Sequence, residues 1–204
     1  LLARHFQISS AARRAPANVS PMLQSLHVSS IDAATLNGRL FLLMAGVGVD
    51  AWIVHALHRH RRGPISKLSY MRPAFASLAR TLPPRISVRV DGETIIDSAP
   101  ATALIANLPE YGTGRPIIPS ALGNDGLLDV CVWRGITPLS PGIVHLAALA
   151  GLATRVPGAQ LLRGRVVEID SPLPLPVQAD GDPAGVTPAR IELPGRSVPF
   201  IVPA

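Results

Sequence analysis

The amino-acid sequence predicts a mainly β protein with helices, an α+β domain built as a β-sandwich with peripheral helices. Short runs of alternating or continuous apolar residues fill the second half, which is typical of many short strands. Asn-Gly and Asp-Gly pairs separate some of these runs, and such pairs favour tight hairpin turns. The regular alternation of strands and helices that builds a parallel sheet is absent from the sequence.

Helical signals are concentrated in the first part of the chain and recur once later. Pro21 suits the first turn of a helix, whereas Gly63 and Pro64 break one. Apolar residues recur at helical spacing between Leu139 and Leu152. We therefore expect helices over residues 1–7, 20–26, 50–60, 66–82 and 138–154.

Strand signals follow a period of two from Ile31 onward. Asn37-Gly38 and Asp91-Gly92 each lie between two such runs, as the turn of a hairpin requires. Residues 101–106 form a nearly continuous apolar run, as expected of a buried strand. The expected strands cover residues 31–36, 39–44, 86–90, 94–96, 101–106, 127–133, 166–169, 175–179, 189–193 and 198–202.

Charge and composition narrow the class of protein. The net charge is +6 and nearly all basic residues are arginines, which suits phosphate or an acidic membrane surface but equally fits an Arg-rich composition. Aromatic side chains are missing among the basic residues, so we expect no nucleic-acid binding. The N-terminus lacks a signal-peptide pattern, and the lone Cys131 lies in an apolar run. These features predict a cytoplasmic protein.

Two local patterns have more than one interpretation. Residues 46–51 (Gly-Val-Gly-Val-Asp-Ala) fit a dinucleotide-binding fingerprint, but the expected acidic residue about 20 positions later is absent. A tight strand-to-helix turn capped by Asp50 is the other interpretation. His55, His58 and His60 stand among arginines, whose charge opposes a zinc ion. A solvated basic helix end and a membrane-facing patch are the alternatives.

An acid pair, Asp180 and Asp182, flanks Gly181 just after an apolar run. We expect the pair to be buried or half-buried at a strand end. A carboxylate held there can take a proton from a hydroxyl, and a second acid can hold a metal or orient a phosphate. A simple turn is the alternative, because Pro183 and Gly185 follow.

A long loop rich in glycine and proline is expected over residues 107–124. It begins with Asn107 at the end of a strand, contains Gly112 and Gly114, and leads to Asp125. Loops of this length are uncommon in compact domains unless they are functional. We therefore interpret this loop as part of a binding site.

The order of these motifs resembles the C-terminal half of the diacylglycerol kinase family, which includes bacterial lipid kinases and sphingosine kinases. The resemblance extends over essentially the whole chain. Its motifs are Leu2-Ala3-Arg4 with Ile8, Phe41–Ala51, Asn107, Pro119-Ser120-Ala121, Asp125-Gly126-Leu127-Leu128-Asp129 and Gln178-Ala179-Asp180-Gly181-Asp182.

The resemblance implies an ATP-dependent lipid kinase, with Asp180 as the base that deprotonates the lipid hydroxyl. Asp182 is implied to lie near the phosphates and the metal. A carboxylate and backbone carbonyls are ligands that suit Mg²⁺. The other residues implied are Asn107, Gly112 and Gly114 on the nucleotide side, and Asp125 with the carbonyls of Leu122 and Leu127 around a structural Mg²⁺.

This sequence departs from the family pattern in three places. Asp182 stands where the family has Glu, and Thr113 stands where a glycine is usual. The Gly-Gly-Asp-Gly-Thr loop that cradles the phosphates of ATP is not in the sequence. We therefore expect residues 1–30 to be the tail of the nucleotide-binding lobe and its connector, and residues 31–204 to be the lipid-side β-sandwich, with most of the ATP site outside this chain.

The expected partners follow from the same resemblance. They are a lipid substrate and peripheral contact with a membrane, while homodimer formation stays open. Two alternative functions remain at this point. One is a non-catalytic lipid- or membrane-binding module, and the other is a soluble-metabolite kinase of the NAD kinase type.

Overall fold

A computed structural model describes residues 2–6, 26–60, 83–110, 116–135, 147 and 150–203. The helix expected over residues 66–82 and most of the ones expected over 20–26 and 138–154 lie outside the described residues. The helices are α1 (Leu2–His5), α2 (Val49–His60) and the 3₁₀ helix η3 (Ala153–Arg155). The strands are β1 (Leu26–Asp32), β2 (Ala34–Leu36), β3 (Arg39–Phe41), β4 (Met44–Val47), β5 (Arg85–Val90), β6 (Glu93–Ala106), β7 (Leu128–Arg134), β8 (Ala159–Gly164), β9 (Val166–Asp170), β10 (Pro176–Ala179), β11 (Asp182–Val186), β12 (Ala189–Glu192) and β13 (Ser197–Pro203).

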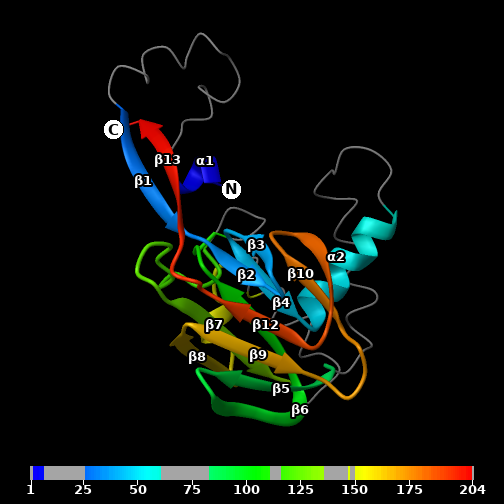
Figure 1. Ribbon diagram of the computed structural model, residues 1–204. Helices are drawn as coiled ribbons and strands as arrows, with labels where there is room; N and C mark the ends of the chain where they lie inside the picture. Colours follow the sequence, from blue (N-terminus) through cyan, green and yellow to red (C-terminus); the bar gives the residue numbers. More distant parts are fainter. Residues whose placement is uncertain are drawn as a thin grey trace.

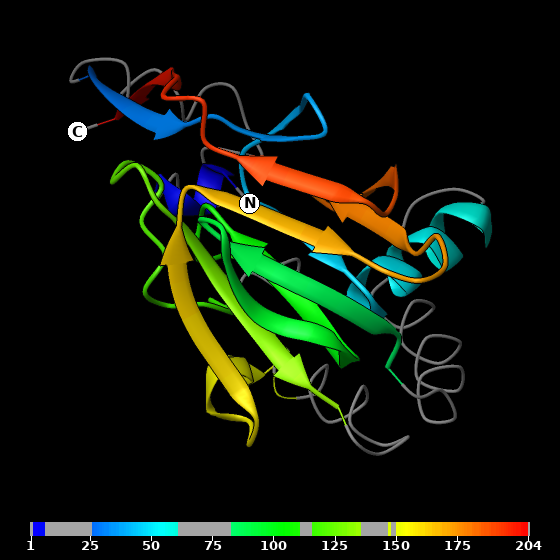
Figure 2. The same ribbon diagram turned by 60° about the horizontal axis from the view of Figure 1, so that its bottom comes forward.

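The described strands build a β-sandwich, so the predicted fold class is confirmed. Eleven strands form one sheet that folds into two layers, shown from two sides in Figures 1 and 2. The first layer has the order β11-β10-β4-β6-β7-β8, and the second has the order β6-β5-β9-β12-β2-β3. Every described pairing is antiparallel. Strands β1 and β13 pair separately as a ribbon that extends from one end of the sandwich (Figure 1).

The core lies between the two layers, where side chains alternate along each strand. Val130 and Val132 of β7 point into this core, whereas Cys131 and Trp133 point into a smaller cluster on the outer face of the first layer. Residues 117–121 and η3 cover that outer face. The first layer is therefore apolar on both faces, which explains why its strands appeared as continuous apolar runs.

Strand β6 connects the two layers and differs from the prediction. The sequence suggested separate strands over 94–96 and 101–106, but β6 runs unbroken for 14 residues. Its first half pairs with β5 and its second half with β4 and β7. Ser98 has a φ of +38°, and the register against β5 shifts after Ile86. These irregularities let one strand turn from one layer into the other.

Several other strands also differ from the sequence prediction. Strands β8 and β11 were not predicted; β11 contains a proline and a glycine, and it lies at the edge of the sheet, where a missing N–H is tolerated. Leu26 begins β1 rather than ending a helix. The predicted domain boundary at residue 30 falls within β1 and stays a prediction. Among the described residues, no helix has the length and apolarity needed to cross a bilayer.

Candidate functional site

One end of the first layer collects the residues that the sequence singled out. The register aligns Ala179 of β10 with Ala45 of β4, and Met44 of β4 with Ala106 of β6. It also aligns Ala106 with Asp129 of β7. The chain therefore leaves β10 at Asp180, leaves β6 at Asn107 and enters β7 after Asp125 along the same edge. We call this end of the first layer, where these strands begin or terminate, the site end.

Asp180 occupies the turn between β10 and β11, and its side chain folds back onto the start of β4. Its carboxylate accepts backbone N–H groups from Leu42 at 2.9 Å, Leu43 at 2.8 Å and Met44 at 3.0 Å. The residue has a φ of +52° and its own N–H donates to the Met44 carbonyl. Asp180 is thus exposed but firmly oriented, and the expectation that the acid pair is buried or half-buried is wrong.

A second Asp-Gly turn provides a direct comparison. Asp91 and Gly92, between β5 and β6, have φ values of +48° and +87°, against +52° and +85° for Asp180 and Gly181. The Asp91 carboxylate likewise accepts backbone N–H groups, from Arg165 at 2.9 Å and from the next residue at 2.8 Å. The predicted hairpin turn at Asp91 is confirmed. Both carboxylates therefore hold backbone N–H groups of a neighbouring segment, and this shared role is structural.

A buried glutamine supports the turn that carries Asp180. Gln178 is 1% exposed; its side-chain carbonyl accepts the Gly181 N–H at 2.9 Å, and its amide donates to the Asp50 carboxylate at 2.7 Å. Gly46 lies against this pair, because a Cβ there would stand 2.6 Å from Asp50 Oδ2 and 3.0 Å from Gln178 Nε2. The Gly-Val-Gly-Val-Asp-Ala segment that begins at Gly46 therefore packs beneath the turn that carries Asp180.

This geometry decides between the two interpretations of residues 46–51. Strand β4 pairs antiparallel with both neighbours, so the parallel strand–helix–strand unit of a dinucleotide site is not formed. Gly48 has a φ of +97° and leads directly into α2. The motif makes a tight strand-to-helix turn.

Asn107 holds the same segment as Asp180 from the other side. Its amide donates to the carbonyls of Asp32 at 2.8 Å and Leu42 at 2.7 Å. The structure therefore brings Asn107 and Asp180 together, on either side of Leu42. The Asn107 residue is 1% exposed, and its Oδ1 has no hydrogen-bond partner among the described residues. Such an unsatisfied buried acceptor calls for a ligand donor or a water.

Asp182 lies in β11, opposite Ala179, and is exposed. Its carboxylate makes no hydrogen bond or ion pair with the described residues. Gly112 and Gly114 lie outside the described residues. Among the histidines, His55 Nε2 is 2.9 Å from the Val177 carbonyl, so this nitrogen carries the proton and donates it. No group of three or more His, Cys, Asp or Glu side chains in the described part of the chain is placed to hold a metal.

Asp125 lies in the loop before β7 at the site end, and its carboxylate contacts β8. Four strand spacings separate β10 from β8, roughly 19 Å at about 4.8 Å each. The Asp125 carboxylate accepts the Leu127 N–H at 3.1 Å through Oδ1 and forms an ion pair with Arg163 of β8 through Oδ2. Desolvation lowers the pKa of Arg163, but Asp125, with Asp129 contributing less, raises it above its ordinary value.

The donors at Asp125 fit the implied structural Mg²⁺ poorly. Of the three residues implied as ligands, only Asp125 offers a carboxylate, and one of its oxygens contacts a guanidinium. A divalent cation bound there would lie next to a fixed positive charge, which opposes its binding. The magnesium site at Asp125, Leu122 and Leu127 stays a prediction, and the ion pair between Asp125 and Arg163 argues against it.

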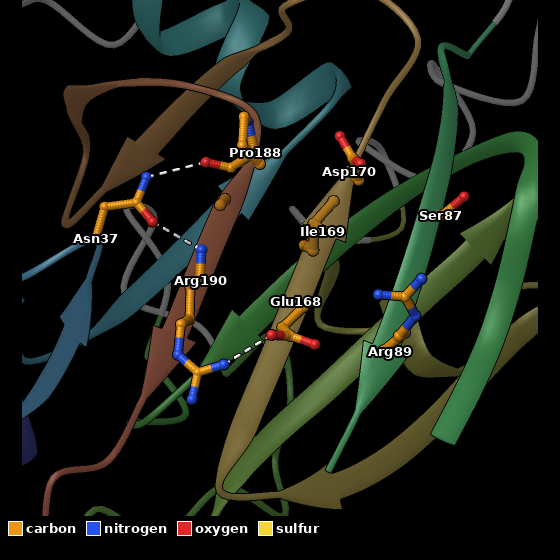
Figure 3. Close-up of a pocket in the computed structure, with 9 residues that line it drawn as sticks. Asn37, Ser87, Arg89, Glu168, Ile169, Asp170, Pro188 and Arg190 are labelled. Carbon is orange, nitrogen blue, oxygen red and sulfur yellow. Dashed lines mark hydrogen bonds and ion pairs between the residues drawn. The ribbon is translucent and has the colours of Figure 1, made fainter. Parts of the chain in front are cut away.

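Figure 3 shows a pocket on a different surface, the outer face of the second layer. It spans β5, β9 and β12, and the side chains at its rim are charged or polar. Arg190 pairs with Glu168 at 2.7 Å, and Asn37 Nδ2 donates to the Pro188 carbonyl (Figure 3). The residues that line this pocket do not include Asp180 or Asn107. We therefore place the candidate site at the site end.

Comparison with known proteins identifies the family of this chain. The sequence model of a family described as the YegS C-terminal NAD kinase β-sandwich-like domain matches residues 44–202. The chain belongs to this family. The matched YegS-type segment runs from β4 to β13 and includes Asn107 and Asp180.

Curated proteins similar to this chain have kinase names. A probable lipid kinase YegS-like protein of Shewanella frigidimarina is 24% identical over 85% of this chain and 55% of its own length. A diacylglycerol kinase of Mycobacterium tuberculosis is 27% identical over 74% of this chain and 48% of its own length. The chain therefore spans about half the length of these relatives. A crystal structure of a diacylglycerol kinase from Bacillus anthracis shares the fold, with a TM-score of 0.53, 21% identity and coverage of 81% of this chain and 51% of that chain.

Two residues at the site end were not identified from the sequence. Arg163 lies in a strand that was not predicted, so nothing in its local sequence paired it with Asp125. Gln178 was noted only as part of a motif. Its place in an apolar strand was the signal available, because a buried amide requires partners.

Proposed function

We propose that this chain is the lipid-side half of an ATP-dependent lipid kinase of the diacylglycerol, sphingosine or phosphatidylglycerol type. Membership of the YegS C-terminal family and the names of the curated relatives support the proposal. Because the chain spans about half of those relatives, most of the ATP site is assigned to the part that it does not match. Residues 31–204 are then the lipid-side sandwich.

The observation that carries the proposal is the fixed carboxylate of Asp180. An ionised carboxylate offers about four lone-pair positions, and three backbone N–H groups occupy three of them here. The free position can accept the proton of a lipid hydroxyl as its oxygen bonds to the γ-phosphorus of ATP and the bond to ADP breaks. A positioned base of this kind contributes about 10² to 10⁴ in rate.

Neighbouring residues have supporting roles in this proposal. The buried Oδ1 of Asn107 has no partner among the described residues, and we propose that it accepts a hydrogen bond from a water that also contacts the nucleotide or the lipid. Asp182, exposed beside the turn, lies near the phosphates, and Gly112 and Gly114 complete the nucleotide side. Mg²⁺ bound with ATP supplies neutralisation of the phosphate charge.

The proposed setting is the cytoplasmic face of a membrane, with peripheral contact. The surplus of arginine supports contact with anionic head groups. An apolar cleft beside the site end is proposed to take the acyl chain. Whether two copies of the chain associate is left to measurement.

The test is ATP-dependent phosphorylation of diacylglycerol, sphingosine and phosphatidylglycerol in mixed micelles. The protein tested is this chain and any longer product of its gene. We expect Asp180→Asn to lower lipid-dependent ATP turnover by at least about 10²-fold. Asp91→Asn is the matched control, because it removes one charge from a turn of the same geometry. Both variants keep the Oδ1 oxygen that accepts two N–H groups.

Three outcomes contradict the proposal in distinguishable ways. Full turnover in Asp180→Asn places the base elsewhere. We expect this chain alone to be inactive, because most of the ATP site is assigned outside it. Binding to lipid vesicles by a longer gene product without any ATP turnover supports the non-catalytic lipid-binding module. Phosphorylation of NAD rather than lipid supports the soluble-metabolite kinase.

A further inference from the structure

Three charged side chains from the loop before β7, from β7 and from β8 form one cluster. Arg163 pairs with Asp125 through Nη2, and its Nε lies 3.5 Å from Asp129 Oδ2. Asp129 and Arg163 face each other in the β7–β8 ladder, whereas Asp125 comes from the loop before β7. The guanidinium thus joins two carboxylates that different segments supply. We call Asp125, Asp129 and Arg163 the arginine cluster.

Asp129 has a particular need for a cation. Its side chain is 1% exposed, and its Oδ1 accepts the Ser120 hydroxyl at 2.7 Å. Its Oδ2 has no hydrogen-bond partner among the described residues. A buried carboxylate without a positive partner is strongly unfavourable. Arg163 is the cation that the described residues place beside it.

The loop before β7 is fixed from its other side as well. Asp32, at the end of β1, donates its backbone N–H to the Gly123 carbonyl at 2.6 Å. Its carboxylate accepts the Gly126 N–H at 2.8 Å. The loop therefore has two attachments, to β1 through Asp32 and to β8 through the arginine cluster. Both attachments use only groups of this chain.

We propose that the Arg163 guanidinium takes the place of a structural divalent cation at Asp125, so that the loop before β7 is held without Mg²⁺. The guanidinium donates to the carboxylate that a cation would need, and it also balances the charge of the buried Asp129. A divalent cation at Asp125 would have to displace Arg163 and leave Asp129 without a counter-ion. Any Mg²⁺ that the protein uses is then bound with ATP. This inference does not depend on the proposed kinase activity.

Thermal unfolding of this chain in EDTA and in millimolar Mg²⁺ tests the inference. We expect the melting temperatures in the two solutions to agree within about 2 °C, the range of a neutral surface change in a chain of this size. Isothermal titration with Mg²⁺ is expected to show no stoichiometric site. A Mg²⁺-dependent rise of several degrees in the wild-type chain would overturn the inference.

Variants separate a guanidinium from a metal as the partner of Asp125. Arg163→Ala is expected to lower the melting temperature in EDTA and to make it rise with Mg²⁺, because the two carboxylates are then free for a cation. Arg165→Ala is the control: its exposed side chain has no hydrogen bond or ion pair with the described residues, and we expect a change within about 2 °C.

A second variant covers the case in which Arg163→Ala does not fold. Asp125→Asn removes the charge that both a metal and Arg163 would bind. If Arg163 is the partner, this variant is less stable than the wild-type chain in EDTA and in Mg²⁺ alike. A loss of stability that occurs only in Mg²⁺ would show a metal site and refute the inference.

Discussion

Alanine at position 46 tests whether Gly46 is required by packing beneath the Asp180 turn. The added Cβ would stand 2.6 Å from Asp50 Oδ2, 3.0 Å from Gln178 Nε2 and 3.3 Å from Leu104 Cδ1. Contacts below 3.0 Å force a neighbour to move, and the nearest atom belongs to the Asp50–Gln178 hydrogen bond. Gly46→Ala is therefore expected to break that bond or to shift β4.

The magnitude follows from two terms. Overpacking a well-filled site costs about 1–3 kcal/mol, and a hydrogen bond to a charged group contributes about 1.5–3 kcal/mol. If the neighbours move, the overpacking is relieved but the hydrogen bond is weakened, so only about one of the two costs remains. Alanine also restricts the unfolded chain, which stabilises the folded protein by about 0.4–1 kcal/mol. We expect a net loss of about 1–2 kcal/mol, which lowers the melting temperature by about 2–8 °C in a domain of this size.

The assay is thermal or urea unfolding of a double-mutant cycle that combines Gly46→Ala with Asp50→Ala. If Asp50 is the group that the new methyl displaces, Gly46→Ala costs at least about 1 kcal/mol less in the Asp50→Ala background. Equal costs in both backgrounds would show that the two residues do not interact. A fully stable Gly46→Ala protein would refute the packing argument itself.

Two further predictions concern the cluster on the outer face of the first layer. Burial raises the pKa of Cys131 from 9.0 to about 12, so the folded thiol should resist alkylation at pH 8. As the pH rises, the thiol ionises in the unfolded chain before it ionises in the folded one. The buried thiol therefore contributes fully to stability below pH 9, and this contribution declines towards pH 12. Cys131→Ala should remove this part of the pH dependence in urea unfolding. Trp133 Nε1 donates to the buried Ala153 carbonyl at 2.8 Å. Trp133→Phe should therefore lose about 1–3 kcal/mol in urea unfolding. Trp52 of α2 is half-buried and its side chain has no hydrogen bond with the described residues, so Trp52→Phe should change stability less; equal losses would contradict the role of the bond.

The local parts of the fold could be predicted from the sequence because their causes are local. Asn37-Gly38 and Asp91-Gly92 make hairpin turns, since both positions of such turns need positive φ. The helix α2 begins and ends within a residue of its prediction. The bend in β6 had no such signal, because Ser98 adopts a φ of +38° that only tertiary pairing imposes.

The arrangement of the candidate site could be predicted only in part. The motifs located Asn107 and Asp180 at strand ends, which the structure confirms, whereas Asp125 lies in the loop before β7. That Asn107 and Asp180 meet at Leu42 depends on β4 lying between β6 and β10, and strand order is not a local property. Arg163 could not be found at all, because its role depends on the pairing of β7 with an unpredicted strand.

Turn geometry alone gives Asp180 no special status. Asn37, Asp91 and Asp180 all have φ values between +48° and +52°, each is followed by a glycine, and each bonds to the backbone of another segment. What distinguishes Asp180 is its neighbour. Leu42 and Leu43 both link it to Asn107, whose buried Oδ1 lacks a partner among the described residues. A reactive role must therefore come from this neighbourhood. Equal loss of lipid turnover in Asp91→Asn and Asp180→Asn would show that the turns matter for folding alone.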